Sequence, residues 1–75
     1  MASAYLKIVI EPGREEVVKA ALSKMPQVTS VDLTSGEQDL ICLLEGESYE
    51  EILNIVVKKI RLIEGVSNTI TDLVV

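Results

Sequence analysis

The sequence predicts an α+β domain of the ferredoxin-like βαββαβ type, in which a four-stranded antiparallel sheet carries two helices on one face. Four segments have strand character, because their apolar residues recur at every second position or occupy both sides. Two other segments carry apolar residues at helical spacing. The order is strand, helix, strand, strand, helix, strand, which right-handed crossovers fold into one sheet. With 75 residues the chain has room for one core, so residues 1–75 are a single domain.

The first half of the chain contains a strand, a helix and a second strand. The segment Ala4–Glu11 has the period of a strand, with one face made of Leu6, Ile8 and Ile10, and it ends at Pro12. The helix is indicated by an apolar stripe at positions i, i+3, i+4 and i+7, made of Val18, Ala21, Leu22 and Met25. Pro26 stops this helix, because the residue before a proline avoids helical backbone angles. The β-branched segment Val28–Thr34 is the second strand.

The second half repeats the pattern with a strand, a helix and a strand. The segment Asp39–Glu45 is apolar on both sides, so this strand needs a cover on each face of the sheet. Ser48 and Glu51 have the spacing of a capping box at the start of the second helix. Gly65 marks the turn before the last strand, Val66–Val75. One face of that strand is expected to hold Val66, Ile70 and Val74.

The predicted sheet has a face without helices, and the composition indicates what covers it. Of all residues, 48% are apolar and only 3% are aromatic, which is more aliphatic surface than one thin core hides. The uncovered face would carry Tyr5, Val9, Val28 and one side of each of the last two strands. We expect a homodimer that forms through the sheet and removes this face from water. The alternative is a monomer with scattered exposed aliphatic residues.

The charge balance excludes several classes of partner. Twelve acidic and seven basic residues give a net charge of −5, which repels a phosphate backbone, so we expect no direct DNA binding. The cluster Lys58, Lys59 and Arg61 complements the dipole at the end of the second helix. No apolar run approaches the roughly 18 residues that span a bilayer, and the N-terminus has no signal-type stretch. We therefore expect a cytoplasmic protein that does not bind membranes.

Catalytic and metal chemistry is not indicated. The chain has no histidine, so the commonest general base and the commonest metal ligand are both missing. Its single cysteine, Cys42, lies inside an aliphatic run and is expected in the core. No metal-ligand spacing and no glycine-rich phosphate loop occur. The sequence predicts a protein that is not an enzyme and that holds no cofactor or metal.

Two turn segments carry the polar groups that suit a small zwitterion. They are residues 36–39 and residues 65–71, and each combines a turn glycine with polar side chains and backbone amides at the rim of a strand. Asp39 either caps its own turn or receives a ligand ammonium group. Thr69 and Thr71 are either ordinary strand formers or hydroxyl donors to a ligand. The predicted ligand-binding residues are Ser35, Gly36, Gln38, Asp39, Thr69 and Thr71.

With this element order, the chain resembles the effector-binding domain of the Lrp/AsnC regulators of amino-acid metabolism, over essentially all 75 residues. The specific points of resemblance are Gly36-x-x-Asp39, Val28-x-x-Val31 and the Gly65-Val66 turn that leads to Thr69-x-Thr71. The resemblance implies a dimer made through the sheets, assembly of dimers into rings such as octamers or decamers, and amino-acid effectors bound between dimers. Amides around Gly36 would take the effector carboxylate, and Asp39 its ammonium group.

Two departures from the family pattern bear on the expected function. Regulators of the family carry an N-terminal helix-turn-helix domain, whereas here the sheet begins within a few residues of Met1. The chain thus resembles a stand-alone form that would act on full-length regulators of the same family. The residue before the aspartate is often aromatic in the family and is Gln38 here, so the amino acid stays unspecified. Two other functions fit the residues: an ACT-like amino-acid-binding module, and an oligomerisation protein without a ligand.

Overall fold

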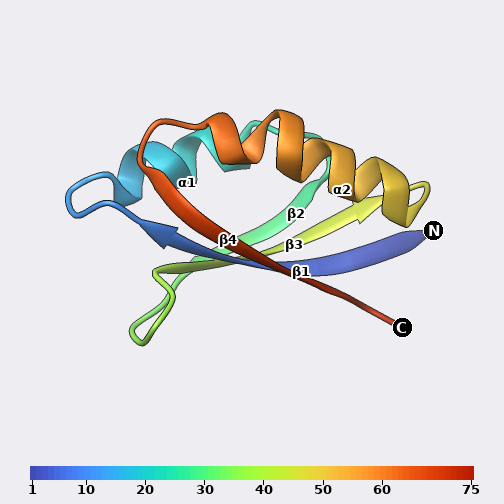
Figure 1. The fold of residues 1–75 in the computed structure, drawn as a ribbon, viewed down its shortest axis with the longest axis horizontal. Coiled ribbons are helices and arrows are strands. Elements are labelled where there is room, and N and C mark those ends of the chain that lie inside the picture. Colours follow the sequence, from blue (N-terminus) through green and yellow to red (C-terminus); the bar gives the residue numbers. More distant parts are fainter.

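The computed structural model describes all 75 residues and confirms the predicted architecture. In chain order the elements are β1 (Ala2–Ile10), α1 (Glu15–Ser23), β2 (Val28–Leu33), β3 (Leu40–Gly46), α2 (Tyr49–Lys58), the short 3-10 helix η1 (Ile60–Leu62) and β4 (Val66–Leu73). The strands form one antiparallel sheet in the order β2-β3-β1-β4. Both helices lie on the same side of this sheet, and its other side is uncovered (Figure 1).

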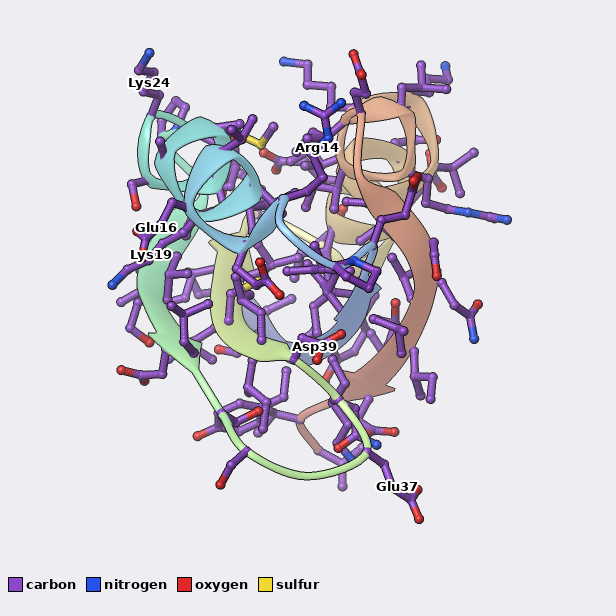
Figure 2. The ribbon with its side chains drawn as sticks, turned by 90° about the vertical axis from the view of Figure 1, so that its left-hand side faces the viewer. Arg14, Glu16, Lys19, Lys24, Glu37 and Asp39 are labelled. Atoms are coloured by element: carbon purple, nitrogen blue, oxygen red, sulfur yellow. The ribbon has the colours of Figure 1, made fainter.

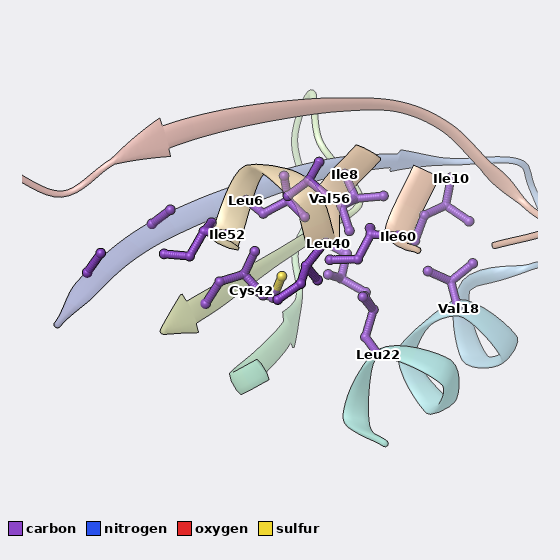
Figure 3. Close-up of a cluster of buried hydrophobic side chains, with 14 residues drawn as sticks. Leu6, Ile8, Ile10, Val18, Leu22, Leu40, Cys42, Ile52, Val56 and Ile60 are labelled. Carbon is purple, nitrogen blue, oxygen red and sulfur yellow. The ribbon is translucent and has the colours of Figure 1, made fainter. Parts of the chain in front are cut away.

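The core lies between the sheet and the two helices. Every second residue of β1, from Ala2 to Ile10, is buried, as strand alternation requires when one face is covered. Leu40, Cys42 and Leu44 of β3 lie beside them in the same layer. The helices contribute the buried residues Val18, Leu22, Ile52, Ile55 and Val56, and η1 adds Ile60 (Figure 3). All of these side chains are apolar, so the folded chain buries no side-chain charge.

The two helices begin in different ways. At α2 the predicted capping box is confirmed, because the Ser48 hydroxyl accepts a hydrogen bond from the Glu51 amide at 3.1 Å. The Glu51 carboxylate accepts in return from the amide of Glu47 at 2.8 Å, one residue before the usual position. Helix α1 has no side-chain cap and ends at Ser23. Met25, which the stripe placed in this helix, lies beyond its end and still packs against the core.

The prediction that Val28 lies on the uncovered face is wrong. In the β2–β3 pairing Val28 is opposite Leu44 while Ser30 is opposite Leu43, so Thr29 is an extra residue in β2. Paired residues share a face of the sheet, and Leu44 is buried under the helices. Val28 therefore lies on the helix side, where it packs against the core.

A second irregularity corrects the prediction that Val66 shares a face with Ile70. Val66 pairs with Ile10 and Asn68 pairs with Val9, which leaves Ser67 as the extra residue in β4. Because Ile10 is buried on the helix side, Val66 lies on that side as well and packs against the core. Ile70 pairs with Lys7 and lies on the uncovered side.

The uncovered side of the sheet is a mixed surface of apolar, polar and charged residues. Its apolar residues, placed by the strand register, are Tyr5, Val9, Ile41, Leu43 and Ile70. Lys7 lies among them, paired with Ile41 and Ile70, and its ammonium group forms an ion pair with the carboxylate of Asp72 at 3.1 Å. Since Tyr5 and Ile70 are more than 40% exposed, the single chain leaves much of this surface in water.

Candidate functional site

The loop between β2 and β3 is closed at its base and open at its tip. The Thr34 amide donates to the carbonyl of Asp39 at 3.0 Å, and the Thr34 hydroxyl donates to the carbonyl of Gln38 at 2.8 Å. Gly36, at φ +151°, turns the chain at the tip. The four amides from Ser35 to Gln38 donate no hydrogen bond within the chain. The loop thus presents free backbone donors on a fixed base.

Asp39 ties this loop to the central strand. Its amide donates to the carbonyl of Ile8 at 3.0 Å, and its carboxylate Oδ2 accepts from the amide of Ile10 at 2.8 Å. The side chain is half-buried, and its Oδ1 accepts no hydrogen bond within the chain. Asp39 therefore does not cap its own turn. It satisfies a backbone amide of β1 and keeps one carboxylate oxygen free for a cation.

The second predicted segment begins at Gly65, whose conformation the structure explains. Its φ of +104° favours glycine, and its carbonyl accepts from the amide of Glu11 at 2.8 Å. A Cβ at this position would lie 2.7 Å from the Cβ of Arg14. Arg14 also forms an ion pair with Glu64 at 3.1 Å. Glycine is thus needed where the start of α1 approaches the turn before β4.

Thr69 and Thr71 lie on the helix side of the edge strand β4. Thr69 pairs with Ile8 and Thr71 pairs with Leu6, and both of these β1 residues are buried under the helices. The two threonines are half-buried, and neither hydroxyl takes part in a side-chain hydrogen bond within the chain. Their hydroxyl groups thus point to the covered side at the border of the sheet.

The structure brings some of the predicted residues to one end of the sheet. Ile8 is paired with both Leu40 and Thr69, so Asp39, next to Leu40, and Thr69 are separated by β1 alone. Two strand spacings correspond to roughly 10 Å. Thr71 lies one pair further along the strand. The tip with Ser35 and Gly36 projects beyond the sheet, and Figure 2 shows Glu37 pointing away from the body while Asp39 lies against it.

Thr34 is a site residue that the sequence reasoning missed. Both hydrogen bonds that close the β2–β3 loop come from this residue. A threonine directly before Ser35-Gly36 carries a signal, since Ser and Thr side chains bond nearby backbone groups in turns. That signal does not name the acceptor, which is four residues away in the chain.

Other chemistry in the chain is limited. Burial raises the pKa of the Cys42 thiol to about 12, so this thiol is a poor nucleophile at neutral pH. The side chains include no cluster of three or more metal-ligating groups. The single chain contains no pocket that encloses a small molecule. Neither α1 nor α2 has the length and apolar character needed to cross a bilayer.

Comparison with known proteins identifies the family. Residues 3–75 match the model of the Lrp/AsnC ligand binding domain. The chain belongs to this family. The family consists of ligand-binding domains of transcriptional regulators and is not enzymatic, so the Lrp/AsnC resemblance and the prediction of a non-enzyme are confirmed.

Similar proteins and structures agree with this assignment. An uncharacterized HTH-type transcriptional regulator of Pyrococcus horikoshii is 33% identical over 72 residues, which cover 92% of this chain and 48% of the regulator. The chain thus spans about half the length of the curated relatives it matches. The crystal structure of TTHA0845 from Thermus thermophilus has a TM-score of 0.95 at 31% identity and covers 100% of this chain and 94% of that one.

A second similar structure is a complex with an amino acid. It is the transcriptional regulator NMB0573 from Neisseria meningitidis with L-Met, at a TM-score of 0.91 and 20% identity, covering 99% of this chain and 49% of that one. At this identity the likeness shows a shared fold.

Proposed function

We propose that this chain is an amino-acid-binding regulatory domain that dimerises through its sheet. The observation that carries the proposal is the rim formed by Asp39 and the β2–β3 loop, which offers a free carboxylate oxygen beside free backbone amides. A zwitterionic amino acid needs both kinds of group. Membership in a family of ligand-binding domains supports the assignment, as does the L-Met complex of the Neisseria regulator.

The chemistry of the rim assigns a role to each predicted residue. Asp39 Oδ1 accepts from the ligand ammonium group in a charge-assisted hydrogen bond. The amides of residues 35–38 donate to the ligand carboxylate, as successive turn amides do for anions. The side chains of Ser35 and Gln38, with the hydroxyls of Thr69 and Thr71, complete the polar wall of the site.

The proposed site is shared between subunits. The loop tip projects beyond the sheet of its own chain, and this chain alone encloses no pocket, so a second subunit supplies the missing wall. Dimers form through the uncovered sheet face and assemble further into a ring such as an octamer or decamer, with effector bound between dimers. Ligand binding and assembly are then thermodynamically coupled. The assembled domain modulates full-length Lrp/AsnC regulators in the cytoplasm and makes no direct contact with DNA.

A thermal-shift screen of the twenty amino acids tests the ligand class. A ligand that binds only the folded state raises Tm, and a concentration one hundred times Kd adds about 2.7 kcal/mol of stability. We expect at least one amino acid to raise Tm. If none does, the chain is an oligomerisation protein without a ligand, and the proposed function is wrong.

The variant Asp39→Asn tests the role of the carboxylate. An asparagine keeps one side-chain oxygen for the amide of Ile10 and removes the negative charge that holds the ammonium group. We expect a Kd at least about tenfold higher by calorimetry, which corresponds to about 1.4 kcal/mol, with an unchanged fold. The matched control is Glu16→Gln on the exposed surface of α1, which makes the same charge change outside the proposed site. Equal affinities in the Asp39→Asn variant and the parent contradict this role.

A further inference from the structure

Helix α2 has an apolar flank that the chain leaves about half exposed. Tyr49, Leu53 and Val57 follow one another at four-residue spacing, so they form one row along the helix. They are 40%, 43% and 53% exposed, whereas Ile52 and Val56 on the neighbouring side are buried. The Tyr49 hydroxyl donates to the carbonyl of Val74, which fixes this ring at one end of the row. Figure 1 shows α2 in the outer, helical layer of the molecule.

The charges at the two ends of this flank have opposite signs. Glu47 and Glu50 are exposed at the N-terminal end of α2. At the C-terminal end the exposed residues are Lys58, Lys59 and Arg61. None of these five side chains belongs to either of the two ion pairs in the chain, Lys7–Asp72 and Arg14–Glu64. The apolar row thus lies between an acidic end and a basic end that are both free.

We infer that α2 binds the α2 helix of a second copy in antiparallel orientation. A twofold axis midway between Leu53 and Val57 sets Leu53 of one copy against Val57 of the other, twice. The same axis places Glu50 opposite the start of η1, beside Arg61 of the second copy. Antiparallel helix dipoles also attract, whereas a parallel pair would bring like charges together at both ends. The net charge of −5 otherwise opposes association, so this self-complementary arrangement selects the partner.

The α2 contact deepens the proposed assembly, since it supplies a second interface for the sheet dimer. Helix α2 lies on the side of the sheet opposite to the uncovered face (Figure 1). One chain can therefore use both surfaces at once. Two different twofold contacts on each chain generate a closed ring or an open chain of dimers. This step of the inference rests on the proposed sheet dimer, while the α2 contact itself does not.

Charge reversals with sedimentation velocity test the antiparallel pairing. Glu50→Lys and Arg61→Glu each place like charges opposite one another, so each should raise the dissociation constant of this contact about tenfold or more and lower the mass at micromolar concentration. The double variant restores both pairs and should restore the mass. An equimolar mixture of the two single variants should also associate, because one copy is then basic at both ends and the other acidic. Added salt should weaken the parent assembly.

Matched controls carry the same net-charge changes elsewhere on the surface. They are Glu16→Lys on α1 and Lys24→Glu after α1, and both residues are exposed and lie on the α1 side of the molecule, away from α2 (Figure 2). These variants should keep the parent mass. Far-UV circular dichroism confirms that each variant is folded, and the exposed-site variant Val57→Gln should lower the mass without any charge change.

Two outcomes overturn the inference. One is an unchanged mass in both single reversals, and the other is failure of the mixed variants to associate. An amino-acid thermal-shift screen of the Glu50→Lys variant distinguishes an incorrect α2 contact from an incorrect proposed function. A preserved ligand response with an unchanged mass rejects the α2 contact alone. A parent without any ligand response, but with the predicted mass changes, rejects the ligand and supports the contact.

Discussion

The two faces of the sheet are built from the same strands, but the helices of the chain cover only one of them (Figure 1). On the helix side Leu6 and Ile8 are 0% exposed, whereas Tyr5, between two helix-facing residues of the same strand, is 49% exposed on the other side. The covered face is completed within one chain and therefore determines folding. The uncovered face carries apolar residues but has no intrachain cover, so changes there should act on association instead.

The largest effect on stability is expected when a side chain in the covered face is shortened. Ile8→Ala removes most of a fully buried side chain between the central strand and the helices, and should cost about 2–5 kcal/mol of unfolding free energy. Urea unfolding followed by circular dichroism measures this loss. The matched control is Val9→Ala, the next residue on the uncovered face, which should cost under about 1 kcal/mol in dilute protein. Equal costs at both positions would remove the distinction between the faces.

A charge at the centre of the uncovered face should have the next largest effect. Leu43→Asp puts a carboxylate into the proposed sheet contact and should weaken dimerisation at least about a hundredfold, because an unpaired charge cannot be desolvated cheaply. Light scattering over a concentration series measures the change. Leu33→Asp, on the helix side of the edge strand β2, is the control and should leave the dimer intact. A Leu43→Asp variant with the parent mass would show that this face is not the contact.

The assignment of residues to the two faces could be predicted from the sequence only where the period is unbroken. In β1 the alternation runs from Ala2 to Ile10, and the sequence identified its buried face correctly. In β2 and β4 an extra residue, Thr29 or Ser67, shifts the pattern at the strand end. Neither residue is the glycine that often marks a bulge. The register is set by the neighbouring strand, so Val28 and Val66 could not be placed from their own segments.

In the candidate site, likewise, nearby residue types predict some features, whereas others depend on contacts between distant parts of the chain. The turn around Gly36 and the polar character of Asp39 follow from local residue types. The hydrogen bond from Ile10 to Asp39 joins residues 29 positions apart, and its donor is a backbone amide without any sequence signal. The pairing of Ile8 with both Leu40 and Thr69, which brings the two segments to one end of the sheet, likewise depends on the folded topology.

The pH dependence of stability that arises from the Cys42 thiol tests whether the core on the covered face excludes water. The unfolded chain releases this proton near pH 9, whereas burial raises the pKa of the folded thiol to about 12. The stability contribution is thus fully present below pH 9 and falls as the pH rises towards 12. Near pH 10.5 the loss should be about 2 kcal/mol, at about 1.4 kcal/mol per pH unit.

The comparison with Cys42→Ala isolates this contribution. Lysine and tyrosine titration is common to both proteins, so the difference between their urea unfolding free energies over this range belongs to the thiol. A difference that does not change between pH 8 and pH 10.5 would show that water reaches Cys42 in the folded chain.

The smallest expected effect is that of the Lys7–Asp72 ion pair. The strength of this pair depends on whether a second subunit covers the uncovered face, so it tests the difference between the two faces. In the single chain the two side chains are 36% and 54% exposed, so a double-mutant cycle with Lys7→Gln and Asp72→Asn should give a coupling below about 1 kcal/mol. In the proposed sheet dimer the same pair loses water, and removal of one partner leaves a charge unpaired in the contact. The coupling measured through dimer dissociation should therefore exceed the coupling measured by unfolding of the monomeric Leu43→Asp variant. Equal couplings in the two measurements would place the pair outside the contact.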